Sequence, residues 1–402
     1  MENSLNINNL STAFGYKKNR ELRFTYYIFK LLKHPAWVKT LSFFANGILK
    51  YNIPLKGLIK NSVFKVFCSG ENITEAFATI KKLETYHVKS VLDYVAEGEK
   101  TQRVFRRNKM IIVKNIFKLG QEAPGNSVSV KFTSLEEIDY FIVLNGLALN
   151  NKLPDNERYL KFLKRIDIIC AAAAKNKVTV YFDAEDRNMQ DIFDLVVESM
   201  MEKYNKEEAI IYNTLQMYLT DRLIYLNKMI ADSRLKNYHP GIKLVRGAYV
   251  EKERIRALQD GRTSPVFNTK LETDAAFNKA LEICLSQHEW VYTCIASHNE
   301  QSNLLAVATI DKYAIHDFYK KVKFSQLYGM RDNLTFNLAA KGYNSSKYLP
   351  YGEVKKAIPY LIRRAEENSS IGEQLTSELL RLRNELTRRK FLGKEIRKLK
   401  PA

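Results

Sequence analysis

Residues 178–204 read VTVYFDAEDRNMQDIFDLVVESMMEKY, and this segment decides the fold class. It begins with a short β-branched and aromatic run, Val178–Glu185, which is typical of a strand. After a polar break, Met189–Tyr204 places apolar residues at helical spacing and predicts a helix. A strand followed directly by a helix is the repeating unit of proteins with parallel β/α architecture.

The same alternation extends in both directions from this segment. The other candidate strands are Ser127–Thr133, Ile210–Tyr218, Gly241–Tyr249, Trp290–His298, Val322–Leu327 and Leu334–Gly342. Helical runs such as Ile166–Lys175 and Ala275–Ser286 lie between them, and a last helix is expected over Tyr351–Asn368. We therefore predict an α/β protein built as a (β/α)8 TIM barrel with one weak strand, in preference to a doubly wound sheet.

The sequence divides into three predicted regions. Residues 1–120 read mainly as helix, including an amphipathic stretch at Thr74–Gly98, and are expected to pack on the barrel. Residues 121–370 are expected to form the catalytic barrel, and residues 371–402 a basic C-terminal helix.

Composition narrows the class of protein further. The formal net charge of +20 favours an anionic partner. The sequence contains no zinc-finger, RRM or basic-heptad signature, so nucleic acid is not the preferred partner. The opening MENSLNINNLS lacks the apolar core of a secretory signal, and no uninterrupted apolar run reaches the roughly 18 residues of a membrane span. We expect a cytoplasmic protein, or one on the inner face of a membrane. The spacing of the four cysteines and six histidines predicts no metal site.

Polar residues recur where the candidate strands end, which is where (β/α)8 enzymes place their active sites. They are Lys131, Asp183, Glu185, Gln216, Lys243, Arg246, Tyr249, Ser297, His298 and Asn299. One such residue would be an ordinary solvated turn, whereas a series over five strands favours a polar pocket. Asp183 and Glu185 are two residues apart and therefore face the same side of their strand.

The last predicted helix carries a second cluster. Tyr360, Arg363, Arg364 and Glu367 recur at spacings of three and four, which gathers them on one face. This face is either a solvated set of ion pairs or a clamp for a carboxylate, which two guanidinium groups bind in a bidentate manner.

A series of motifs then points to a family. The motifs are SVSVKFTS, YFDAED, NTLQMY, KLVRGAYVEKER, SPVFNTK, ASHN, QLYGM, YLPYG and YLIRRAEENSS, and they extend over about Leu92–Ser370. In this order they resemble the proline dehydrogenases. The resemblance implies a distorted TIM barrel that holds FAD at the C-terminal strand ends, which agrees with the missing G-x-G-x-x-G fingerprint. It also implies oxidation of L-proline to Δ1-pyrroline-5-carboxylate by hydride transfer to FAD, with the electrons passed to a membrane quinone.

The resemblance assigns roles to individual residues. Lys131, Arg363 and Arg364 would bind the proline carboxylate, and the ring would lie against Leu327, Tyr348 and Tyr360. Contacts to FAD would come from Gln216, Lys243, Arg246, Lys270, Ser297, His298 and Glu367. The catalytic group would comprise Lys131, Asp183, Tyr249 and Arg246, with Asp183 buried and paired with Arg246. Asp93 and Glu97 match an acidic pair at the pocket mouth, where Glu97 would form a gate with Arg363.

Two comparisons with relatives bear on these roles. Some relatives exchange the lysine and arginine of positions 243 and 246, so either Lys243 or Arg246 would donate to flavin N5. Relatives that prefer hydroxyproline carry serine where Tyr348 stands, and a tyrosine would crowd a ring hydroxyl. We therefore expect proline to be preferred over hydroxyproline.

The C-terminal segment Ser377–Lys400 is basic and contains several leucines. This composition is typical of a helix attracted to anionic lipid, and the alternative is a terminal helix packed on the barrel with a solvated basic face. Two other functions stay open. One is a barrel enzyme that acts on a small anion without flavin. The other is a nucleic-acid-binding module, which explains the charge but not the polar strand ends.

Overall fold

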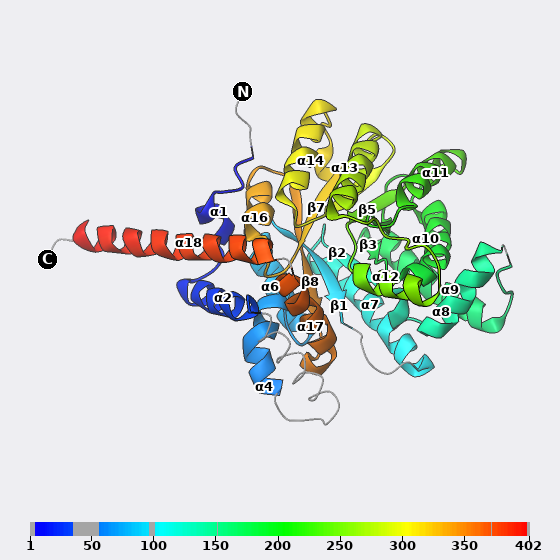
Figure 1. Cartoon of the computed structure of the whole chain (residues 1–402), viewed down its shortest axis with the longest axis horizontal. Coiled ribbons are helices and arrows are strands. Elements are labelled where there is room, and N and C mark those ends of the chain that lie inside the picture. Colours follow the sequence, from blue (N-terminus) through cyan, green and yellow to red (C-terminus); the bar gives the residue numbers. More distant parts are fainter. Residues whose placement is uncertain (1–4, 35–55, 96–100, 151, 371, 400–402) are drawn as a thin grey trace. The chain divides into compact units, whose positions relative to one another are not determined.

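The computed structural model describes residues 5–34, 56–95, 101–150, 152–370 and 372–399. Its eight strands form a closed parallel barrel in the order β1-β2-β3-β4-β5-β6-β7-β8 (Figure 1). The strands are β1 Lys89–Tyr94, β2 Ser127–Val130, β3 Thr179–Phe182, β4 Ile211–Gln216, β5 Gly241–Val245, β6 Tyr292–Ala296, β7 Val322–Leu327 and β8 Asn344–Tyr351. Every residue of β2 and β4 is buried, as expected for parallel strands that are covered on both faces. The predicted TIM barrel is confirmed.

The chain divides into two compact units. The barrel unit comprises residues 89–325 and 342–346, and the terminal unit comprises residues 1–88, 326–341 and 347–402. The helices of the barrel unit are α7 Gln102–Glu122, α8 Ile138–Leu149, α9 Glu157–Asn176, α10 Gln190–Tyr204, α11 Arg222–Leu235, α12 Val250–Gln259, α13 Lys270–Ser286, α14 Glu300–Lys312 and α15 Phe318–Lys321. Polar side chains begin several of them: Asn156 caps α9, Asn299 caps α14, and Thr269 with Glu272 forms a capping box on α13.

An aromatic cluster fixes one side of the barrel unit. Phe132, directly after Lys131, stacks on Phe193 of α10 with ring centroids 4.4 Å apart and on Phe182 of β3 at 5.1 Å. Phe141 of α8 meets the same Phe193 ring edge-on at 4.9 Å. These large rings are fully buried, and their packing fixes Phe132 against β3. The backbone of the neighbouring Lys131 is fixed with it.

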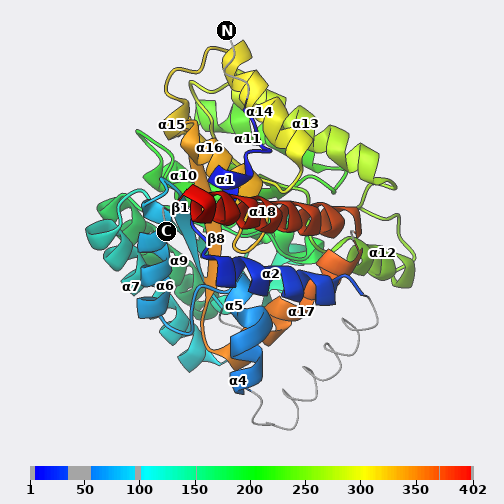
Figure 2. The same cartoon turned by 90° about the vertical axis from the view of Figure 1, so that its left-hand side faces the viewer.

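The terminal unit is mainly helical. Its elements are α1 Leu10–Phe14, α2 Asn19–Leu32, α4 Lys56–Ile59, the π-helical turn Lys60–Phe64, α5 Lys65–Phe67, α6 Ile73–Glu84, α16 Asp332–Ala340, α17 Val354–Ser370 and α18 Gly372–Leu399. Helix α18 packs along α2 (Figure 2). Arg389 of α18 donates to the carbonyl oxygens of Phe14 and Lys17 at 2.7 and 2.8 Å, which ties the C-terminal helix to the end of α1.

Two predicted elements are wrong. The helix expected over Thr74–Gly98 ends at Glu84, and β1 follows it, so the region expected to be mainly helical contains the first barrel strand. A turn separates the two elements, with His87 at a φ of 59°. The strand expected over Leu334–Gly342 is the helix α16, and the eighth strand comes after it. All residues of α16 from Asp332 to Ala339 are buried, so this helix has no solvent-exposed side whose polar residues would reveal its period.

Within the described residues, no helix combines the length and the apolar character needed to cross a membrane.

Candidate active site

Four charged side chains alternate in sign inside the barrel unit. Asp93 lies near the end of β1, Lys131 follows β2, Asp183 follows β3 and Lys243 lies on β5. The Lys131 ammonium is 2.9 and 3.1 Å from the two Asp93 oxygens and 3.4 Å from Asp183 Oδ2. The Lys243 ammonium is 2.6 Å from Asp183 Oδ1. We call this set the strand-end network; it joins four of the residues singled out in the sequence.

Electrostatics keep Lys131 charged. Burial lowers the pKa of Lys131, but the carboxylates of Asp93 and Asp183 outweigh that effect and raise it above its ordinary value. Asp93 is almost fully buried and also accepts a hydrogen bond from Ser129 Oγ at 2.9 Å. Lys131 is therefore a fixed positive charge rather than a proton acceptor at neutral pH.

The pairing of Asp183 differs from the expectation. The sequence predicts a pair with Arg246, but the Asp183 carboxylate contacts Lys243 and Lys131, whereas Arg246 bonds Asp274. The reason is the direction of the two side chains: Lys243 on β5 points to Asp183, whereas Arg246, directly after β5, points to Asp274 of α13 and Ser302 of α14. The Arg246 guanidinium donates from Nε to Asp274 at 2.6 Å, from Nη1 to Ser297 Oγ at 2.6 Å and from Nη2 to Ser302 Oγ at 2.9 Å.

The Arg246 contacts gather several predicted cofactor residues. Lys270, the first residue of α13, is bonded to the same Asp274 carboxylate as Arg246, so two cations meet on one acid. Ser297 follows β6 and is buried, and His298 beside it is half-buried. Asp274 is not among the residues singled out from the sequence, since it directly precedes the predicted helical run Ala275–Ser286 and does not lie at a strand end.

A glycine shapes the loop after β5. Gly247 has a φ of 126°, and a Cβ built there would lie 1.8 Å from Tyr218 Cδ1. Only glycine fits this position, because the backbone angle is unfavourable for other residues and the Tyr218 ring leaves no space for a Cβ. The turn leads to Tyr249, which directly precedes α12.

Glu185 joins three strand ends, and the sequence assigns it no specific role. Its carboxylate accepts hydrogen bonds from the Thr133 hydroxyl at 2.5 Å and the Thr133 amide at 3.1 Å. Its main-chain carbonyl accepts from Gln216 Nε2, at the end of β4, at 2.7 Å. Burial raises the pKa of Glu185 to about 7, against the opposing effect of the Thr133 hydrogen bonds.

The predicted carboxylate clamp lies on α17 in the terminal unit. Tyr360 is buried, Arg363 and Arg364 are half-buried, and the Arg364 guanidinium lies 5.5 Å from the centre of the Tyr360 ring. The helical period brings these residues to one face, as the sequence indicated. The side chain of Glu367 lies outside the described residues.

Three further predicted residues have the following places. Leu327 ends β7 and is half-buried, and so is Tyr348 on β8, whose carbonyl accepts from the Tyr328 amide at 3.0 Å. Asp93 is engaged with Lys131 in the strand-end network. Glu97 lies outside the described residues, so the gate that it would form stays a prediction.

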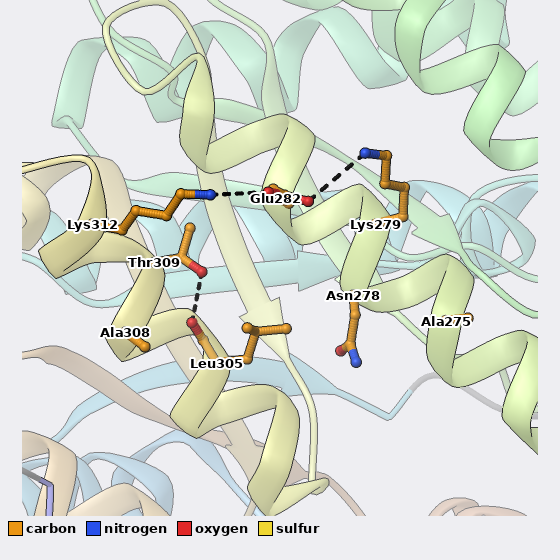
Figure 3. Close-up of a pocket in the computed structure, with 8 residues that line it drawn as sticks. All are labelled: Ala275, Asn278, Lys279, Glu282, Leu305, Ala308, Thr309 and Lys312. Carbon is orange, nitrogen blue, oxygen red and sulfur yellow. Dashed lines mark hydrogen bonds and ion pairs between the residues drawn. The ribbon is translucent and has the colours of Figure 1, made fainter.

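A shallow groove lies between α13 and α14 (Figure 3). Its lining residues are Ala275, Asn278, Lys279, Glu282, Leu305, Ala308, Thr309 and Lys312. The Glu282 carboxylate is 3.2 Å from Lys312 and 3.7 Å from Lys279, so the charges of the groove are matched to one another. Exposed, paired charges on outer helices are ordinary surface features.

Residues 76–377 match the family model described as proline dehydrogenase. The chain belongs to the proline dehydrogenase family. Among similar proteins, proline dehydrogenase 1, mitochondrial, from Dictyostelium discoideum is 32% identical over 95% of this chain and 74% of its own length. The carbapenem antibiotics biosynthesis protein CarD of Pectobacterium carotovorum subsp. carotovorum is 30% identical over 95% and 98%. The hydroxyproline dehydrogenase of Xenopus laevis is 29% identical over 94% and 89%.

A solved structure shows the same fold. Proline utilization A (PutA) from Bdellovibrio bacteriovorus, inactivated by N-propargylglycine, superimposes with a TM-score of 0.68 at 21% sequence identity. The match covers 90% of this chain but only 38% of the PutA chain, which is much longer. The resemblance to proline dehydrogenases drawn from the sequence motifs is confirmed by the family match.

Proposed function

We propose that the protein oxidises L-proline to Δ1-pyrroline-5-carboxylate, with FAD as the hydride acceptor and a membrane quinone as the final electron acceptor. Membership of the proline dehydrogenase family supports proline as the substrate and proline catabolism as the setting. The observation that carries the proposal is the strand-end network, because it fixes two lysine ammonium groups inside a barrel of this family.

The residues of the barrel unit suit a flavin dinucleotide. Lys270 and Arg246 meet on Asp274, and two neighbouring cations are what a pyrophosphate requires. We assign Lys270 to the pyrophosphate, and Ser297, His298 and Glu367 to the rest of the dinucleotide. Gln216, buried at the end of β4, and either Lys243 or Arg246 would contact the isoalloxazine. When bound, FAD would supply the two-electron oxidising capacity that no side chain has.

The substrate carboxylate would be held by cations. Arg363 and Arg364 provide the forked donors that suit a carboxylate, and Lys131 adds a third positive charge. Leu327, Tyr348 and Tyr360 would enclose the ring, and Tyr249 would lie between substrate and cofactor. Holding the ring in one orientation presents its Cδ–H bond for hydride transfer.

The charges also favour the reactive form of the substrate. Positive groups near the amine disfavour the ammonium form, so the bound proline would react as the neutral amine. Its nitrogen lone pair would form the C=N bond as the hydride leaves Cδ, which gives the protonated imine, and this would release its N–H proton to solvent to give Δ1-pyrroline-5-carboxylate. Because the nitrogen is already deprotonated, the reaction needs no strong base. Lys131, held as a cation by Asp93 and Asp183, is suited to binding and not to proton abstraction.

The choice between proline and hydroxyproline would depend on Tyr348. The family includes a hydroxyproline dehydrogenase among the relatives of this chain. A tyrosine ring at the substrate wall leaves less room for a ring hydroxyl than a serine does. We expect proline to be turned over faster than 4-hydroxyproline, and equal rates would refute this role of Tyr348.

Quinone reduction would place the enzyme beside a membrane, and we propose a peripheral contact on its inner face through α18. This helix buries Leu375 and Leu382 in the terminal unit, while Leu380, Arg383 and Lys390 are exposed. Basic residues with an exposed leucine suit an anionic lipid surface. Co-sedimentation with anionic liposomes should weaken when Arg383 and Lys390 become glutamate, and undiminished binding would refute the contact.

The deciding experiment is anaerobic addition of L-proline to the purified protein with its visible spectrum recorded. Loss of the flavin absorption would support cofactor, substrate and redox chemistry together. A flavin band that proline leaves unchanged would refute proline as the substrate. A protein that binds no flavin after incubation with FAD would refute the flavin mechanism and favour the barrel enzyme without flavin.

A further inference from the structure

Glu185 is a buried acid that touches three successive barrel elements. It lies two residues beyond Asp183 after β3, its side chain holds Thr133 after β2, and its carbonyl holds Gln216 at the end of β4. Only 9% of the residue is exposed. A carboxylate taken out of water at this cost is retained where its hydrogen bonds organise the surroundings.

We infer that Glu185 is a positioning residue that fixes the ammonium of Lys131 and the amide of Gln216 in the active site. Thr133 is two residues from Lys131, so anchoring its amide and hydroxyl fixes the backbone from which Lys131 extends. The Gln216 side chain is oriented by the Glu185 carbonyl, whatever the charge of the carboxyl group. The catalytic meaning of this arrangement rests on the function proposed above.

Glu185 also determines the charge of its surroundings. Lys131 and Lys243 balance Asp93 and Asp183, so the strand-end network is neutral and an ionised Glu185 adds one negative charge. Lys131 and Asp183 are charged groups that act on Glu185, Lys131 lowering its pKa and Asp183 raising it. An added negative charge near Lys131 weakens the attraction for a substrate carboxylate, whereas the protonated acid does not. Because the pKa of Glu185 is raised by burial to about 7, this change falls near neutral pH.

The inference is tested with two substitutions at Glu185. Glu185→Ala removes both hydrogen bonds to Thr133, and the amide hydrogen of Thr133 should exchange with solvent at least about tenfold faster. The KM for proline should rise by about tenfold, with a smaller change in kcat. Glu185→Gln keeps a side chain that can accept from the Thr133 amide, so it should restore slow exchange. It cannot ionise, so it should lack the increase in KM that ionisation of Glu185 is expected to contribute in the wild type between about pH 6 and 8.

Controls separate this inference from general damage and from the proposed function. Glu198→Gln removes another carboxylate whose pKa burial raises, on α10 and bonded to Tyr225, and it should leave the exchange of Thr133 and the pH profile unchanged. Thr133→Val removes only the hydroxyl donor and should reproduce part of the rise in KM, which covers the case in which Glu185→Ala does not fold. Unchanged exchange at Thr133 in Glu185→Ala, or a wild-type pH profile in Glu185→Gln, overturns the inference. Hydrogen exchange needs no turnover, so a wild-type flavin that proline fails to reduce refutes only the proposed function.

Discussion

Asp332 should be a main source of stability in the terminal unit. The side chain is buried at the start of α16 and lies 2.9 Å from the ammonium groups of both Lys17 and Lys347. Tyr16 donates a further hydrogen bond to it at 2.9 Å. Lys347 is fully buried and donates to the carbonyl oxygens of Leu327 and Met330, so Asp332 is the counter-ion of a lysine that cannot reach water.

The size of the effect follows from the charges. Burial raises the pKa of Asp332, but Lys17 and Lys347 more than compensate and hold it at about 2. Compared with about 3.9 for an unfolded aspartate, this corresponds to about 2.5 kcal/mol at neutral pH. Removing one partner of a buried ion pair also leaves the other charge uncompensated, and costs about 3–5 kcal/mol. Asp332→Asn should therefore lower the melting temperature by about 4–6 °C if the whole chain unfolds together.

Thermal and urea unfolding of the wild type and Asp332→Asn will measure the difference. Because the folded-state pKa is depressed, the stabilisation is present above the pKa of the unfolded aspartate and is lost as the pH falls towards about 2. The two proteins should thus converge in acid. Glu282→Gln is the matched control, since Glu282 also lies between two lysines but at the surface (Figure 3), and its loss should have no measurable effect. Equal stability of the wild type and Asp332→Asn at neutral pH would refute the reasoning.

Three further predictions address other parts of the molecule. Arg364→Ala should raise the KM for proline by about 10–100-fold with unchanged FAD content, because a charge-assisted bond to the carboxylate is lost, and steady-state kinetics with flavin absorbance will decide. Lys323→Met should raise the free energy of unfolding at neutral pH, measured with urea, by up to about 3 kcal/mol, because burial lowers the pKa of Lys323 to about 8. In the wild type, the free-energy cost of burying the charged lysine disappears only as the pH rises above that value. Gly247→Ala should lower the free energy of unfolding by about 1–3 kcal/mol or more, and with it the melting temperature, because the new Cβ would overlap the Tyr218 ring. An unchanged melting temperature would contradict the close approach of this ring to the turn.

The sequence predicted the repeating pattern better than the individual partners. Strands with β-branched and aromatic runs, such as β3, were recognisable because local composition and burial agree there. The eighth strand was misplaced because α16 is buried all round and its sequence resembles a strand. The same limit applied to ion pairs. The polar strand ends were visible, but the choice of Lys243 over Arg246 as the partner of Asp183 depends on which residue faces the barrel interior after the strand ends.

Asp183 allows two neighbouring lysines to stay charged in this barrel. Its two oxygens contact two different ammonium groups, Lys243 at 2.6 Å and Lys131 at 3.4 Å. Without an acid between them, two partly buried lysines would repel and one would lose its proton, since like charges and burial both disfavour the ionised form. With Asp183 and Asp93 in place, the pKa of Lys131 is raised instead. The acids of the network therefore keep Lys131 in its ammonium form, and under the function proposed above their role would be electrostatic and not that of a base.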